Sequence, residues 1–202
     1  VVVDWHPPNG SYHAYPLPSA PAPTQNADSR LIAFTRERLL PAVTAAMAAK
    51  HQFRTYYYGN FATAESLDRE LNAFSPNERG SRLWRTYDGR PRFGTNYVGL
   101  RNRIPILSEA YSYLDFAGRV GVTEAFVEEI MRFVGANADE MRSIVAAADA
   151  DTARVHPPKA GGVAFAPPAL PAPPDILVGA VGTGPKHRPL RLLSRLGRNA
   201  PT

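Results

Sequence analysis

The sequence predicts an α/β domain in which a mostly parallel or mixed sheet is flanked by helices and followed by a proline-rich tail. Short apolar or β-branched runs alternate with longer stretches of helical apolar period, which favours this fold class. Hydrophobic residues make up 44% and charged residues 20% of the 202 positions, as in ordinary folded domains. Ten of the 20 prolines lie in residues 151–202. We therefore divide the chain into a domain over 1–150 and a basic, proline-rich linker or tail over 151–202.

The first 50 residues predict a strand, a loop and a helix. Residues 1–5 are typical of a short buried strand, which Pro7 and Pro8 end at His6 because proline cannot continue a central ladder. The prolines of residues 12–26 predict a loop. Apolar residues at helical spacing predict a helix over 28–50, which Pro41 is expected to kink or split.

The remaining elements are predicted by the same patterns of period and composition. In chain order they are a strand at 53–58, a long excursion over 59–94 with a short helix at 64–74, extended segments at 97–102 and 104–111, a helix over 122–145, and a small strand at 176–181.

Composition excludes several classes of protein and partner. The absence of cysteine excludes disulfides and thiolate metal sites. No apolar run approaches the roughly 20 residues of a membrane span, so none is predicted. Residues 151–202 hold seven Lys or Arg and two Asp or Glu, while the rest of the chain is neutral. We interpret this basic tail as a solvated segment and predict no nucleic-acid partner; a tether to an acidic surface is the weaker alternative.

Two predicted strands carry ionisable residues at their carboxyl ends, where α/β sheets bind ligands. His6 is a candidate zinc ligand, and Asp4, two residues earlier on the same strand face, could orient its ring. A histidine bonded to the backbone is the alternative interpretation. Glu109 is a candidate general base near a metal. A salt bridge to Arg101 or Arg103 explains this glutamate equally well.

Two segments resemble zinc metallocarboxypeptidases of the carboxypeptidase A type, bacterial members in particular. "VVVDWHPPNGSYH" resembles the segment that brings in the third zinc ligand, and "RFGTNYVGLRNRIPILSEAYSY" resembles the one that carries the catalytic glutamate. The histidine precedes the glutamate, as in the family. The resemblance covers residues 1–150 and implies the C-terminal part of the catalytic domain, with helices on both sides of the sheet.

The resemblance also implies roles for individual residues. His6 would be a zinc ligand, and Glu109 would deprotonate the attacking water and pass the proton to the leaving amine. Tyr97 would contact the substrate near the scissile bond, with Tyr87 as a competitor for that role. Arg101 would bind a substrate carboxylate or neutralise the glutamate. The implied function is zinc-dependent removal of C-terminal residues from peptides, in an extracellular or periplasmic location.

The chain departs from the family in its metal ligands. None of the five histidines is followed three residues later by Glu, so the family's His-x-x-Glu zinc pair is not in this sequence. A catalytic zinc has three protein ligands, and this chain supplies one. We expect the others in a missing upstream half of the same domain, and we expect this chain alone to be inactive. The alternative is a non-catalytic, carboxypeptidase-like binding or structural module.

Overall fold

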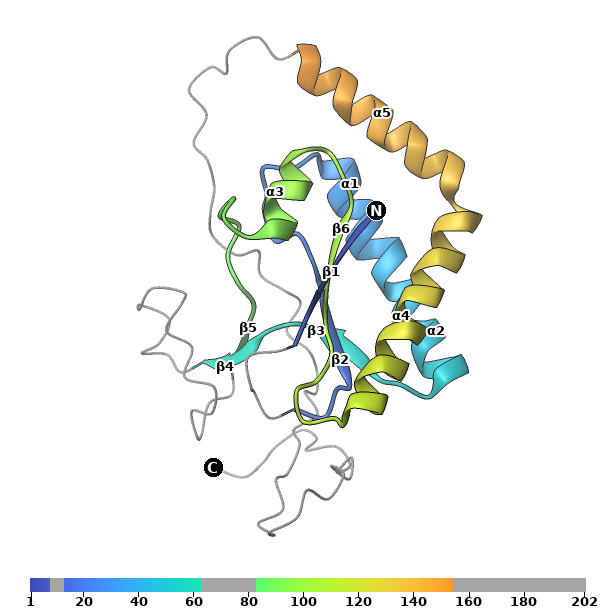
Figure 1. The fold of residues 1–202 in the computed structure, drawn as a ribbon. Helices are drawn as coiled ribbons and strands as arrows, with labels where there is room; N and C mark the ends of the chain where they lie inside the picture. The colour runs from blue at the N-terminus through green and yellow to red at the C-terminus, as the bar shows by residue number, and fades with distance from the viewer. Residues whose placement is uncertain (8–12, 63–82, 155–202) are drawn as a thin grey trace.

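The fold is an α/β arrangement around a mixed four-stranded sheet, which confirms the predicted class (Figure 1). The computed structural model describes residues 1–7, 13–62 and 83–154. The strands lie in the order β1 (Val2–His6), β6 (Pro105–Glu109), β2 (Leu17–Pro21) and β3 (Thr55–Tyr57). β1 runs parallel to β6 and β3 parallel to β2, while β2 and β6 are antiparallel. A separate antiparallel pair is formed by β4 (Asn60–Ala62) and β5 (Leu83–Arg85).

The predicted helix over 28–50 is confirmed as three consecutive helical segments, α1 (Ser29–Ala33), η1 (Phe34–Leu39) and α2 (Leu40–His51). Asp28 caps the start, its side chain accepting a hydrogen bond from the Arg30 amide at 2.9 Å. η1 is a π-helical turn that ends directly before α2, whose first turn contains Pro41. The change of winding therefore lies at the predicted interruption, and the helix continues through it.

The single helix predicted over 122–145 is wrong in its extent, because two helices occupy this region. α4 (Phe116–Ala136) begins after Asp115, whose carboxylate accepts from the Gly118 amide at 2.7 Å. Asn137 ends α4, and α5 (Ala138–Arg154) follows at once. The apolar period does not reveal this break, since it continues on both sides.

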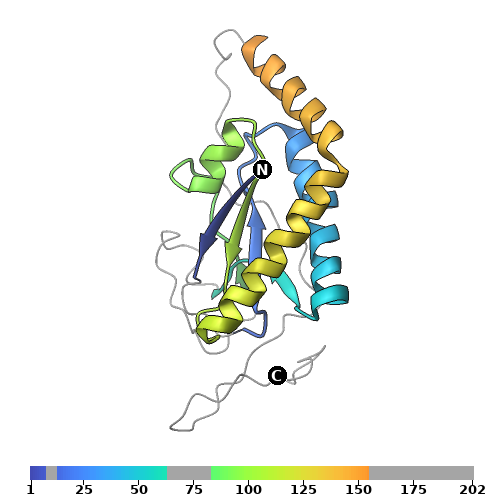
Figure 2. The ribbon, with the colours of Figure 1, turned by 45° about the vertical axis from the view of Figure 1, so that its right-hand side comes forward.

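One face of the sheet is covered by α2 and α4, and α3 (Gly94–Leu100) lies on the opposite side (Figure 2). We call the covered side the helix face. Val3, Leu17 and Ile106 point into it and pack with fully buried helix residues such as Phe126. Side chains alternate along a strand, so Asp4, His6, Leu107 and Glu109 lie on the other side, which we call the site face. There a smaller cluster packs around Ala20, Leu107 and Tyr87.

Three expectations for the strands and the following segments are corrected. The first strand was expected to be buried, yet β1 lies at the edge of the described sheet, and Trp5 is 61% exposed. Residues 97–102 were expected to be extended but belong mainly to α3. The predicted loop over 12–26 contains β2, which is buried at every position.

The prolines of β2 are tolerated because the strand changes partner halfway along. Residues 17–19 pair with β3 and residues 19–21 pair with β6. Pro18 therefore faces a ladder on one side only, and so does Pro21. The predicted strands at 53–58 and 104–111 are confirmed as β3 and β6. The elements predicted at 64–74 and 176–181 lie outside the described residues.

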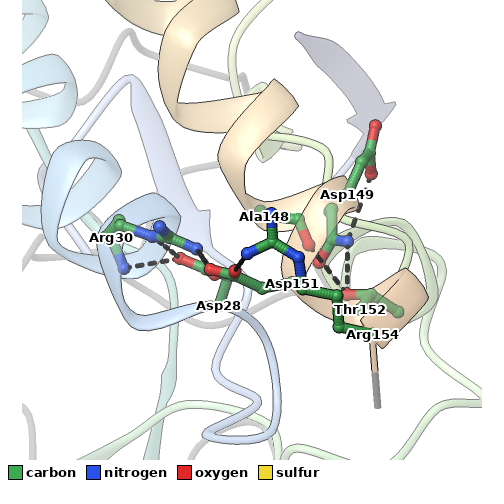
Figure 3. A network of polar contacts seen from close by, with 8 residues as sticks. Asp28, Arg30, Ala148, Asp149, Asp151, Thr152 and Arg154 are labelled. Carbon is green, nitrogen blue, oxygen red and sulfur yellow. Dashed lines mark hydrogen bonds and ion pairs between the residues drawn. The ribbon is translucent and has the colours of Figure 1, made fainter. Parts of the chain in front are cut away.

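Ion pairs and hydrogen bonds connect the C-terminal end of α5 to the rest of the domain (Figure 3). Arg30 bridges Asp28 and Asp151, at 2.6 Å to each carboxylate. Asn102 donates to Asp149 and Thr152 at 3.1 and 2.8 Å. This helix buries only Met141 and Ala148, so these contacts supplement a small apolar interface.

None of the helices within residues 1–7, 13–62 and 83–154 is long and apolar enough to span a bilayer.

Candidate functional site

The strand pairing brings His6 and Glu109 together at one end of the sheet. They are register partners at the carboxyl ends of the parallel strands β1 and β6. The Ala110 amide donates to the His6 carbonyl at 3.0 Å and holds this register just beyond the strand end. Partners in register point to the same face, so both side chains lie on the site face.

The His6 ring is oriented by a carboxylate. Its Nε2 lies 3.0 Å from Oδ1 of Asp4, and both side chains remain partly exposed. The partner is therefore a carboxylate and not the backbone group of the alternative interpretation. This contact leaves Nδ1 as the ring nitrogen for a further ligand, the arrangement that second-sphere carboxylates give to metal-bound histidines.

Asp4 itself lies close to the start of α3. A side chain at Gly94 would place its Cβ 3.3 Å from Oδ2 of Asp4. A larger residue at this position would therefore crowd the carboxylate that orients His6. Gly94, which has no side chain, leaves room for the Asp4 carboxylate at the start of α3.

Glu109 is a buried carboxyl group. It is 5% exposed, and among the described residues no cation pairs with it and its Oε2 has no hydrogen-bond partner. Burial, and in smaller part the negative charge of Asp4, raises the pKa of Glu109 to about 8. Arg103 pairs instead with Asp149 at 3.0 Å, and no salt bridge joins Arg101 to Glu109 in the described part of the chain. A strongly perturbed acid at a strand end is typical of a functional group.

Tyr87 and Tyr58 form the aromatic wall beside this carboxyl group. Burial raises the pKa of both phenols, and the charge of Glu109 adds to the effect. The hydroxyl of Tyr87 lies 2.6 Å from Oγ1 of Thr95 in α3. Tyr97, by contrast, is 57% exposed on the same helix. The structure therefore places Tyr87 beside Glu109. The sequence had left the choice between Tyr87 and Tyr97 open.

Arg101 does not join this group. It follows α3 and precedes β6, whereas Glu109 is the last residue of β6. The five residues of that strand alone separate the two by about 13 Å. Arg101 therefore lies toward the opposite end of the sheet from His6 and Glu109.

Asn96 fixes the loop that carries Tyr87, a role that the sequence did not indicate. Its side-chain amide donates to the carbonyls of Asp88 and Arg90 at 2.7 and 3.0 Å, and its oxygen accepts from the Thr24 amide at 3.0 Å. The residue is fully buried. No signal in the sequence identified this role, because the helix α3 that carries Asn96 was itself not predicted.

The site offers one histidine suited to a metal. Among the residues that the structure describes, no group of three or more His, Cys, Asp or Glu side chains could hold an ion. His6, oriented by Asp4 and open at Nδ1, fits the part of a single ligand. Additional ligands would have to approach the site face from elsewhere.

Comparison with known proteins gives no family assignment: no family model, no curated protein and no solved structure matches the chain.

Proposed function

We propose that this chain is the C-terminal part of a zinc-dependent, carboxypeptidase-like hydrolase that removes C-terminal residues from peptides. One observation carries the proposal: His6 and Glu109, far apart in sequence, are register partners on one face at the carboxyl ends of parallel strands. A metal ligand and a general base have to be neighbours in such a reaction. The resemblance of the two segments to the family points to the same pair.

His6 is the residue of this chain that would hold zinc, through Nδ1. Asp4 fixes the tautomer by accepting from Nε2, which makes the free nitrogen a better ligand. Zinc, when bound, would polarise the scissile carbonyl and the attacking water. The two other protein ligands would come from the upstream half of the same domain.

Glu109 is the proton carrier in this proposal. Its buried carboxyl group takes the proton of the attacking water and passes it to the leaving amine. Its unpartnered Oε2 is available for that contact, and its raised pKa of about 8 places it near the range that suits a general base. A cation beside it would lower this pKa and favour the ionised form. Tyr87, whose hydroxyl lies 2.6 Å from Oγ1 of Thr95, is the candidate for the substrate contact near the scissile bond.

The test uses a longer polypeptide in which an upstream segment carrying the His-x-x-Glu pair precedes Val1. We expect one zinc per molecule and release of C-terminal residues from a panel of peptides. Glu109→Gln should lower kcat by about 10²- to 10⁴-fold with zinc retained, because only the proton carrier is lost. His6→Ala should lose both zinc and activity. Glu124→Gln, at an exposed site on α4, and His187→Ala are the matched controls and should change neither.

Two results would count against the assignment. Full activity in the Glu109→Gln or the His6→Ala variant would show that other residues do the chemistry. A longer polypeptide that folds but binds no zinc and cleaves no peptide would favour the alternative, a non-catalytic binding or structural module.

A further inference from the structure

The exposed large apolar side chains of the described residues come from three elements. A folded domain usually scatters such side chains singly over its surface. Here they belong to β1 and the residue before it, to α3 on the site face, and to α4 and the loop before it: Val1, Val2, Trp5, Tyr97, Tyr113, Phe116, Val120 and Met131. Their concentration on so few elements indicates an interaction surface.

β1 has an open hydrogen-bonding edge. The Val2 amide donates to the Ile104 carbonyl at 2.9 Å, so Val2 and every second residue after it are the ones bonded to β6. In a parallel ladder the residues between them direct their N–H and C=O groups to the other side. Val3 and Trp5 therefore point these groups away from β6, where the described part of the chain supplies no strand. Edge strands are ordinarily protected by lysine, proline or a bulge, and neither residue gives that protection.

The exposed apolar residues of α4 form a stripe on the side of this edge. At 3.6 residues per turn, Phe116, Val120 and Met131 fall within about 60° of one another, and we call them the α4 stripe. Glu129 lies about 180° from the stripe around the helix, and it contacts Lys50 of α2 at 2.8 Å. Since α2 packs on β3, at the edge of the sheet opposite β1, the stripe faces the β1 side (Figure 2).

Tyr97 and Val2 are exposed at the same edge on the site face. Gly94 at the start of α3 approaches Asp4 of β1, and Tyr97 lies one turn later on the same side of that helix. Tyr97 is 57% exposed and Val2 is 44% exposed. Apolar side chains are therefore uncovered on both faces of the sheet beside one open strand edge. A polypeptide that continues the sheet and both of its covering layers would fit this surface.

We propose that the upstream half of the domain docks on this surface, adding a strand to the open edge of β1 and covering the α4 stripe and Tyr97 with apolar side chains. The inference rests on the proposed function, which requires an upstream half. His6 lies on β1, so a polypeptide docked along this strand reaches the site face, where further metal ligands are needed.

Two other occupants fit the surface less well. Ten of the 20 prolines lie in residues 151–202, and proline donates no backbone hydrogen bond. The proline-free apolar run at 176–181 is long enough for the five residues of β1 but not for the α4 stripe and Tyr97 as well. A second copy of the chain would bring its own His6, and not the two further ligands that a catalytic zinc takes.

Hydrogen exchange of backbone amides, followed by NMR, tests the docking in the 202-residue chain and in the longer polypeptide. The amides of Val3 and Trp5 should exchange about 100-fold more slowly in the longer polypeptide, because only there do they have a partner. The Val2 amide, bonded to the Ile104 carbonyl, is the internal reference and should be protected in both proteins. Equal exchange of Val3 and Trp5 in the two proteins would overturn the inference.

A charge introduced into the α4 stripe gives a second measurement. Met131→Lys should leave the Tm of the 202-residue chain unchanged, because the side chain is 69% exposed there. In the longer polypeptide it should lower Tm by about 5 °C, because the lysine would be buried in the interface. Ala136→Lys, at an exposed position on the opposite side of α4, is the matched control and should be neutral in both. A Met131→Lys variant that is equally harmless in the two proteins would contradict the docking.

Two results would assign the surface to a different occupant and overturn the inference. Protection of Val3 and Trp5 in the 202-residue chain that disappears when residues 155–202 are deleted would assign the edge to the tail. Protection in the 202-residue chain that increases with protein concentration would assign it to a second copy.

The docking and the hydrolase can fail separately. If the longer polypeptide binds zinc and cleaves peptides while the Val3 and Trp5 amides exchange as in the 202-residue chain, the docking is wrong and the hydrolase stands. If the amides are protected and Met131→Lys destabilises the longer polypeptide, but no peptide is cleaved, the docking stands and the hydrolase is wrong.

Discussion

Two glutamates are almost equally buried in this domain, and their surroundings are opposite. Glu129 on α4 is 4% exposed, and its oxygens lie 2.8 Å from Lys50 Nζ and 3.1 Å from His51 Nε2. Glu109 on the site face is 5% exposed and faces Asp4 and phenol groups, and one of its oxygens has no hydrogen-bond partner among the described residues. The pKa of the first is lowered by its hydrogen-bond partners, and the pKa of the second is raised by burial.

The difference separates a carboxylate that links two helices from the carboxyl group that we propose as the proton carrier. Glu129 joins the C-terminal end of α2 to α4 and thereby supports the helices that cover the sheet. Glu109 is held in an unfavourable ionisation environment by the register of β1 and β6. Burial alone therefore says little about role. The partners of a buried acid decide whether its charge contributes to stability or is kept available for chemistry.

The largest expected effect on stability is at Glu109. Its folded pKa lies above the unfolded value, so its stabilising contribution is complete below pH 4.5 and is lost as pH rises through about 8. Glu109→Gln should match the native chain near pH 4.5 and exceed its unfolding free energy by about 5 kcal/mol above pH 8, where the carboxylate is ionised in both states. Urea unfolding between pH 4.5 and 9 measures this.

The exposed Glu124→Gln is the control for that series and should show no such pH-dependent gain. A Glu109→Gln variant that is less stable than the native chain at pH 9 would mean that the carboxylate has a partner, as Glu129 does.

The next effect concerns the orienting carboxylate of the site. In the longer polypeptide, Asp4→Asn should weaken zinc binding by about 10- to 100-fold, because the amide no longer fixes the His6 ring as a carboxylate does. Competition with a chelator measures the affinity. Asp139→Asn, whose carboxylate pairs with Arg142 on its own helix, serves as the control. Unchanged zinc affinity in Asp4→Asn would remove the argument for Nδ1 as the metal-binding atom.

The smallest effect is expected at Glu129, because Lys50 is largely exposed and can return to water. The folded pKa of Glu129 is lowered, so its contribution is present above the unfolded value of 4.5 and is lost as pH falls through the folded value. Glu129→Gln should be less stable than the native chain at pH 7, and the gap should close in acid. Thermal melting of both proteins from pH 3 to 7 measures this difference in stability. A difference that grows in acid would show that the pKa of Glu129 is not lowered by its partners.

Strand and helix periods predicted the fold class and the ends of β1 and β6 correctly, because these signals are local. β2 was missed because its prolines argue against a central strand, and only the change of partner at Ser19 makes them acceptable. α3 was missed because Gly94 and Gly99 weaken a short helical pattern that packing on the sheet restores.

The pairing of His6 with Asp4 was predictable from strand alternation, since two residues apart on a strand means one face. The lack of a salt-bridge partner for Glu109 among the described residues was not predictable. Sequence proximity favoured Arg101 or Arg103 as partners, but the strand carries the glutamate to the far end from both. Tyr58 could be placed near Glu109 only by the packing of the residues after β3 in three dimensions.

The most direct test of the shared site is the titration of Glu109 in the longer polypeptide, followed by carboxyl ¹³C NMR with and without zinc. The Glu109→Gln variant identifies the signal. Our account predicts a pKa near 8 without the metal and a fall of more than one unit when zinc binds, since a cation on His6 would lie beside the carboxyl group. An unchanged titration in the zinc-loaded protein would contradict the claim that these two residues form one metal-dependent site.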